Sequence, residues 1–198
     1  LRGVDGLGLW ASGTVKLNKA TDALGTVLTP RMDWTLATGV DTDPTNYDPS
    51  NLLVDLTIDS ALSLNVNGSA ALDVGNGVLV ATTGTVDLTF ATVTVSDGTT
   101  VLTDANVVSL DVTGAALFAG SGGALNAGHT ALELADTAVG FEASGASFKL
   151  VMAVGALTDS VVENRGDTYL GIQAGITTAQ LRGVDGLGLW ASGTVKLN

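Results

Sequence analysis

The sequence predicts an all-β fold, and three observations support that prediction. Apolar and polar residues alternate with a period of two along much of the chain, as expected for strands with one buried face. Glycine contributes 26 of the 198 residues, almost double its average share of roughly 7%. Aromatic residues make up only 5% of the chain, and the abundant valine and threonine are typical of strands. The alternating apolar positions are Leu7, Leu9, Ala11, Leu64, Val66, Val86, Leu88, Phe90, Leu110, Val112, Leu134, Phe148, Leu150 and Met152.

One segment, LRGVDGLGLWASGTVKLN, occurs twice, from Leu1 to Asn18 and again from Leu181 to Asn198. Two identical copies at an offset of 180 residues indicate a tandem repeat. We therefore expect one complete unit, 1–180, followed by the start of the next, 181–198, in a longer array. Separate domains are usually joined by a polar linker, whereas the stretch around the second copy has apolar residues throughout and lacks proline. No linker is expected between the units.

Glycine also recurs within the unit, and most of the steps between the recurring positions are close to 30 residues. A glycine inside a strand marks a bend, a bulge or a close backbone approach. One such corner per coil predicts a continuous β-solenoid with about six coils per 180-residue unit. The corners are Gly13, Gly39, Gly68, Gly84, Gly114, Gly145, Gly175 and Gly193.

Tandem β-sandwich domains are the alternative fold. Four dipeptides have the composition of tight hairpin turns, which join antiparallel strands. They are Asp5-Gly6, Asn67-Gly68, Asn76-Gly77 and Asp97-Gly98.

Two stretches leave the alternating pattern and are expected to be surface loops, 39–51 and 158–167. The first contains Asp41, Asp43 and Asp48, whose carboxylates are the type of ligand that Ca²⁺ prefers. An EF-hand loop would need glycine and glutamate at its sixth and twelfth positions, and the chain has neither there. Ca²⁺ is thus a candidate ligand, a solvated acidic loop is the alternative, and no other cofactor is expected.

The charge balance excludes several classes of partner. The chain has 8 basic and 20 acidic residues, with a net charge of −12, and such a surface repels nucleic acids. The longest uncharged run, 113–132, is interrupted by glycine, alanine and asparagine, so no membrane span is expected. The absence of cysteine excludes disulfides and thiolate metal sites.

Few residues suggest chemistry. His129 is the only histidine and lies in a polar turn, without a nucleophile motif or a second base. We therefore expect that the protein is not an enzyme. Trp10, Trp34 and Tyr169 are candidates for an exposed aromatic patch that binds sugars or partners, with core packing as the alternative. Alternation places Trp10 on the face opposite to Leu9.

A resemblance to a known class of proteins rests on four segments of the chain, which are LRGVDGLGLWASGTVKLN, VNGSAALDVGNG, ATVTVSDGTT and DTDPTNYDPSN. In these long, acidic, cysteine-free repeats the chain resembles the giant tandem-repeat proteins of bacterial cell surfaces and matrices, which are adhesin-like. The resemblance implies an extracellular or cell-surface location and a role in adhesion, matrix or filament building. The diagnostic ligand motifs of the calcium-stiffened arrays are missing from this chain.

We predict a structural extracellular filament or surface spacer that associates with like chains into filaments or bundles. Six rungs of roughly 4.8 Å would give about 29 Å per unit. The alternative is an adhesin-type module that binds cell-surface glycans or proteins through the loop 39–51 or the exposed aromatic residues.

Overall fold

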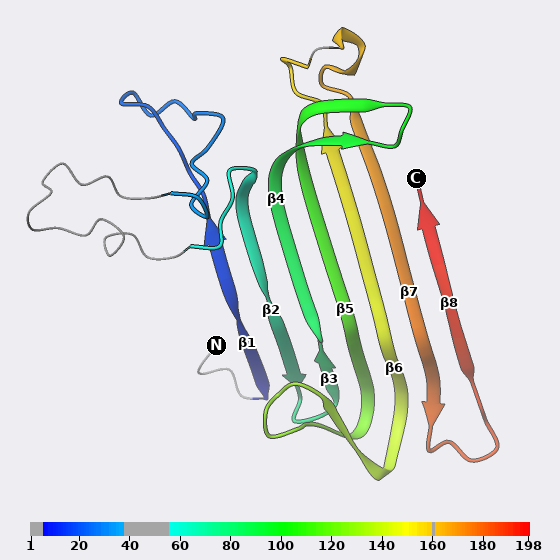
Figure 1. Ribbon diagram of the computed structural model, residues 1–198. Helices are drawn as coiled ribbons and strands as arrows, with labels where there is room; N and C mark the ends of the chain where they lie inside the picture. Colours follow the sequence, from blue (N-terminus) through cyan, green and yellow to red (C-terminus); the bar gives the residue numbers. More distant parts are fainter. Residues whose placement is uncertain (1–5, 38–55, 160) are drawn as a thin grey trace, which may run out of the picture.

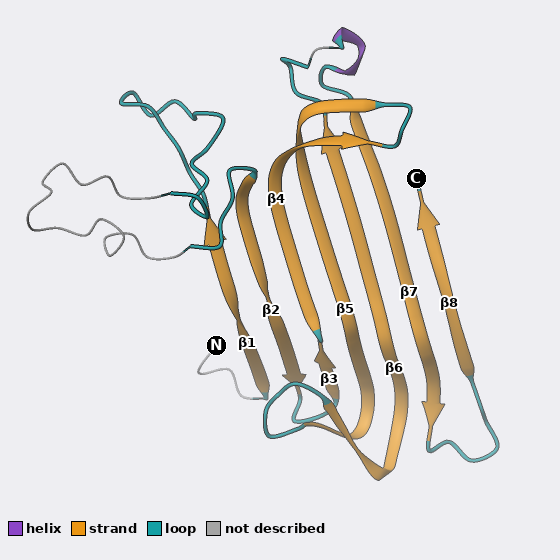
Figure 2. Cartoon of the chain, in the orientation of Figure 1, coloured by secondary structure: helices purple, strands orange, loops and turns teal. Residues whose placement is uncertain are grey.

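The computed structural model describes residues 6–37, 56–159 and 161–198, and these form an all-β structure (Figure 1; Figure 2). The predicted all-β class is confirmed. One short 3₁₀ turn, η2 (Val162–Asn164), lies between β6 and β7. The strands of the described residues are β1 (Leu7–Leu17), β2 (Leu62–Val74), β3 (Leu79–Thr82), β4 (Thr85–Ser96), β5 (Val101–Leu125), β6 (Leu132–Val154), β7 (Thr168–Arg182) and β8 (Trp190–Leu197).

The strands form one antiparallel sheet that follows the order of the chain. The order is β1-β2-β3-β5-β6-β7-β8, and β4 continues the position of β3, because both pair with β2 and β5. The 180-residue unit therefore supplies six strand positions, from β1 to β7, and β8 opens the next set. Figure 1 shows β1 and β8 at opposite edges of the sheet, running in the same direction.

The predicted solenoid coils are not shown by these strands. Neighbouring strands run in opposite directions, whereas the coils of a β-helix stack their strands in parallel. Tight turns account for the reversals: Asn76 and Gly77 take φ angles of 53° and 94° between β2 and β3, and Gly98 takes 91° between β4 and β5. Positive φ angles are typical of hairpin turns. The antiparallel sheet is compatible with the β-sandwich alternative.

The glycines expected at coil corners lie mostly inside strands. Gly13 in β1 is opposite Gly68 in β2, so the turn expected at Asn67-Gly68 is wrong. A β-carbon on Gly68 would collide with the Ser12 carbonyl oxygen, because the two backbones approach closely at this level. Gly39 lies outside the described residues. The other expected corners are Gly84, between β3 and β4, and Gly114, Gly145, Gly175 and Gly193, each within a strand.

One face of the sheet is apolar from edge to edge. Residues that pair directly across strands lie on the same face, so the register gives the composition of each cross-strand row. One row is Val15, Val66, Leu88, Leu110, Leu150, Ile172 and Leu197. A second row is Leu9, Leu72, Ala81, Leu117, Ala143, Ala179 and Ala191. These two rows define the apolar face, and they include many of the alternating positions expected from the sequence.

The opposite face is polar at its centre. Its central row is Thr14, Asn67, Asp87, Asp111, Lys149, Gln173 and Lys196, and it defines the polar face. Lys149 Nζ lies 2.9 Å from Asp111 Oδ2, and the Asn67 amide donates to Asp87 Oδ2 at 3.0 Å. Cross-strand polar pairs of this kind stabilise the side of a sheet that faces solvent.

Both ends of the polar face are covered by the chain itself. Where β4 and β5 bend across one end of the sheet, Leu102, Ala105 and Ala153 form a small buried cluster. At the other end Val80 and Phe118 are fully buried, because the end of the β5–β6 hairpin folds back over them. The rows of the apolar face have no such cover within the described residues, and their large side chains stay half-buried or exposed.

Candidate assembly surfaces

The only histidine has a packing contact. His129 lies in the turn between β5 and β6, with a φ angle of 54°, and its ring stacks on Trp10 with the centroids 4.0 Å apart. The contact holds the end of the β5–β6 hairpin against β1. It gives His129 a structural role, and the expectation that the protein is not an enzyme stays a prediction.

The aromatic residues expected to form a patch lie at separate places. Trp10 is near one end of β1, whereas Trp34 donates its indole N–H to Asn18 Oδ1 at 3.1 Å, just beyond the other end. Asn18 is buried and also donates to the carbonyl oxygens of Met32 and Asp59. Tyr169 lies in β7, five strand positions from β1. The three rings therefore do not gather into one patch.

The metal candidates Asp41, Asp43 and Asp48 and the loop 39–51 lie outside the described residues. Within the described residues, no group of three or more histidine, aspartate or glutamate side chains is placed to hold a metal ion. The adhesin alternative and the Ca²⁺ candidates therefore stay predictions. The described residues of the expected loop 158–167 lie between β6 and β7. Its Asp159 is buried, not at the surface, and accepts the Thr103 amide at 2.7 Å.

Asp87 is the acidic side chain with the densest set of donors on the polar face. The Asn67 amide lowers the pKa of its carboxyl below the ordinary value, with smaller contributions from Thr89 and Asn65, and burial opposes this only in part. The amides of Asn65 and Asn67 donate to its two oxygens at 2.8 and 3.0 Å. Asp87 is thus held as a hydrogen-bonded carboxylate within the sheet.

The two copies of the repeated segment form the two edges of the sheet. Strand β1 and strand β8 share the sequence WASGTVKL, at residues 10–17 and 190–197. β1 pairs with β2, and β8 pairs with β7. An even number of strand positions separates them, so both run in the same direction in an antiparallel sheet.

The two copies use opposite hydrogen-bonding sides of the same sequence. In β1 the backbone N–H and C=O groups of the even-numbered residues point to β2, since the Gly6 carbonyl accepts from the Gly75 amide and the Asn18 amide donates to the Ser63 carbonyl. In β8 the Leu189 carbonyl, equivalent to that of Leu9, accepts from Leu181 at 3.2 Å, so the odd-numbered positions face β7. Each residue of an antiparallel strand directs its N–H and C=O to one neighbour only. The open side of β8 is therefore the side that β1 uses to bind β2.

The register also matches between the two edges. The apolar row that starts at Val15 reaches Leu197, the equivalent of Leu17, and the row that starts at Leu9 reaches Ala191, the equivalent of Ala11. Both rows are displaced by two residues in the same direction. A shift of about 7 Å along the strands and about 29 Å across them therefore carries β1 onto β8.

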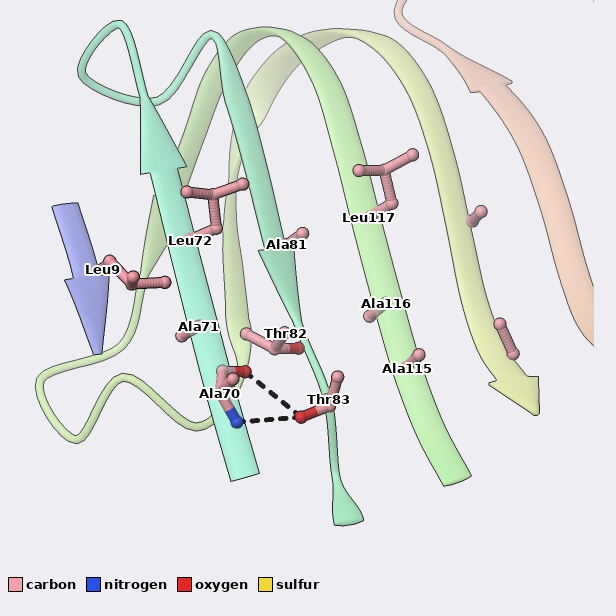
Figure 3. A pocket seen from close by; sticks show the side chains of 12 residues that line it. Leu9, Ala70, Ala71, Leu72, Ala81, Thr82, Thr83, Ala115, Ala116 and Leu117 are labelled. Carbon is pink, nitrogen blue, oxygen red and sulfur yellow. Dashed lines mark hydrogen bonds between the residues drawn. The ribbon is translucent and has the colours of Figure 1, made fainter. Parts of the chain in front are cut away.

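The apolar face contains a shallow hollow of about 310 Å³. Figure 3 shows Leu9, Leu72 and Leu117 projecting around it, with Ala81 between Leu72 and Leu117. At its rim the Ala70 amide donates to Thr83 Oγ1 at 2.8 Å, where β3 gives way to β4. Small alanine side chains leave space between the larger leucines, and apolar side chains from a second surface can pack into that space.

Large side chains of the apolar face reach solvent within the described residues. Leu9, Val15 and Leu197 are 48%, 69% and 59% exposed. Among the described residues, no helix has the length and apolar character required to cross a membrane.

Comparison of the chain with protein-family models, with curated proteins and with solved structures finds no match. The two edges of the sheet and its apolar face are therefore the features of this chain that bear on function.

Proposed function

We propose that the protein is a structural element of an extracellular filament or surface spacer, in which tandem units continue a single antiparallel sheet from edge to edge. One observation carries the proposal: the same sequence forms both edges, in the same direction, on the same face and with complementary hydrogen-bonding sides. In the array, β8 of one unit is β1 of the next. No linker is then needed between units.

The geometry of such an array follows from strand spacing. Six strand positions per unit at roughly 4.8 Å give an advance of about 29 Å, the same length that six solenoid coils would give. The continuity expected of a solenoid is kept, with six antiparallel strands in place of six coils. Open edges, which are the sites of unwanted pairing, would then occur only at the ends of the array.

We further propose that the apolar face is covered by the same face of a second copy, which gives two layers as in a β-sandwich. Ten residues of strand and six strand positions cover about 1,000 Å² per copy, above the roughly 800 Å² per partner of a stable protein–protein interface. The two rows of the apolar face contain no charged side chain. Like faces therefore meet without repulsion, while the polar faces turn outward.

Hydrogen exchange on a two-unit chain tests the continuous sheet. The chain is made by adding residues 19–198 after Asn198. In the single-unit chain we expect protection at the odd amides of β8, such as Ala191 and Val195, because these face β7. In the two-unit chain the even amides, such as Ser192 and Thr194, should become protected as well, because β2 of the added unit pairs with them. Even amides that exchange equally fast in both chains would contradict the continuous sheet.

A lysine introduced on one face or the other tests the second layer. Leu88 and Thr89 are neighbours in β4, both half-buried, and point to the apolar and polar faces respectively. We expect Leu88→Lys to shift sedimentation from the dimer toward the monomer, because an unpaired charge in an apolar interface is costly to desolvate. Thr89→Lys is the matched control and should leave the mass unchanged. Equal sedimentation of the two variants would rule out a layer formed through the apolar face.

A further inference from the structure

We propose that separate copies of this chain join by strand exchange at the open ends of their sheets, in which β1 at the end of one copy takes the place of β8 on β7 at the end of another. The inference rests on the proposed sheet continuity and extends it from units within one chain to separate molecules. The partner is thus a second copy of this chain, and the binding surface is the edge of β7 that β8 occupies.

The edge of β7 accepts either copy of the repeated segment equally well. Its partners in β8 are replaced by identical residues of β1, so that Ile172 meets Leu17 in place of Leu197. In the same way, Ala174 meets Val15 in place of Val195. Every side-chain contact of the β7–β8 ladder is thereby reproduced by the incoming strand.

The incoming β1 does not need to leave its own sheet. The backbone groups of its even-numbered residues stay bonded to β2 of its own copy. Those of its odd-numbered residues, which β8 uses to bind β7, bond to β7 of the other copy. β1 thus becomes a central strand with neighbours on both sides. The apolar side chains of Val15 and Leu17, which are exposed at the edge, then have neighbouring strands on both sides, and burying them favours the joined state.

β8 is the edge strand that is easier to displace. β1 is paired without interruption over Leu7–Leu17, whereas the β7–β8 ladder contains an irregularity between Ile176 and Ala179. All residues of Trp190–Leu197 are exposed. Exchange therefore breaks a short ladder and forms an identical one, and the released β8 regains conformational freedom.

Cysteine cross-linking tests the exchange, and the lack of native cysteine keeps the experiment simple. In the chain Gln173 is opposite Lys196, and in the exchanged state it is opposite Lys16 of the second copy. We refold a mixture of a Gln173→Cys chain and a Lys16→Cys chain and oxidise it. A second mixture pairs Gln173→Cys with Thr14→Cys, two residues out of register. We expect about tenfold more cross-linked heterodimer in the first mixture, because a disulfide needs Cα atoms within roughly 7 Å.

A locked variant separates exchange from misfolding. In the double variant Gln173→Cys/Lys196→Cys, oxidation fixes β8 to β7 and should abolish end-to-end oligomers, which return on reduction. The control Ser12→Cys/Ser69→Cys replaces two hydroxyls 3.1 Å apart in β1 and β2, and its oxidation should leave the oligomers intact. Equal cross-linking in and out of register, or oligomers that persist in the oxidised β7–β8 variant, would overturn the proposal. If the even amides of β8 are protected in the two-unit chain while these tests fail, sheet continuity stands and only the exchange between molecules is wrong.

Discussion

Strands β1 and β8 have the same sequence but different surroundings. Trp10 is 37% exposed, whereas Trp190 is 73% exposed, because His129 stacks only on the first. Val15 and Val195 are similarly exposed, at 69% and 72%, since both lie at an open edge. The strand at WASGTVKL and the choice of face are thus common to both copies, whereas side-chain burial depends on which neighbours the rest of the unit supplies.

A local contact that is the same in both copies supports this distinction. The Trp10 ring lies over Gly8, two residues before it in the chain, and the Trp190 ring lies over Gly188 in the same way. Residues two apart in a strand point to the same face, and a glycine leaves room for the indole. This contact needs no partner strand, and it is therefore present at both edges.

The largest effect is expected from the glycine inside the repeated segment. A β-carbon on Gly13 would collide with the carbonyl oxygen of Asn67, whereas the equivalent Gly193 has no atom in reach. We expect Gly13→Ala to lower the free energy of unfolding by about 2–3 kcal/mol, because two backbones must separate, and Gly193→Ala to change it by about 0.5 kcal/mol or less. Urea denaturation measures both. In the two-unit chain Gly193→Ala should acquire most of the larger effect, and equal small effects in all three cases would show that β1 and β2 do not approach as described.

The sequence predicted the strands of this fold well, because alternation depends only on which face each side chain takes. Leu88 and Leu110 were expected on one face, and they are opposite each other in β4 and β5. The residues around the second copy of the repeated segment likewise predicted that the two units join without a linker, which stays a prediction. The location of the candidate assembly surfaces thus follows from a repeat that is visible in the sequence.

The connection of the strands was harder to predict, because parallel and antiparallel strands have the same alternation of faces. Asn76-Gly77 is a turn and Asn67-Gly68 is inside a strand, although the two dipeptides are identical. Both glycines approach the backbone of a residue distant in the chain, Gly68 that of Gly13 and Gly77 that of Gly123, and no local pattern shows which of the two dipeptides turns. The burial of Phe118 likewise depends on the folded-back end of the β5–β6 hairpin, which no local pattern indicates.

The stacking contact at β1 should give a smaller difference between the two copies than the glycine does. Trp10→Ala removes the ring that His129 packs against, and we expect a loss of about 1–2 kcal/mol in the free energy of unfolding. Trp190→Ala removes a ring without such a partner in the single-unit chain, and the expected loss is about 0.5 kcal/mol or less. Thermal and urea denaturation compare the two variants. If a second unit is added, its own histidine, equivalent to His129, should stack on Trp190 and raise the loss for Trp190→Ala to that for Trp10→Ala. Because this rise needs the next unit to sit on β8 as the first sits on β1, its absence would place the following unit elsewhere and leave the edge of β8 open.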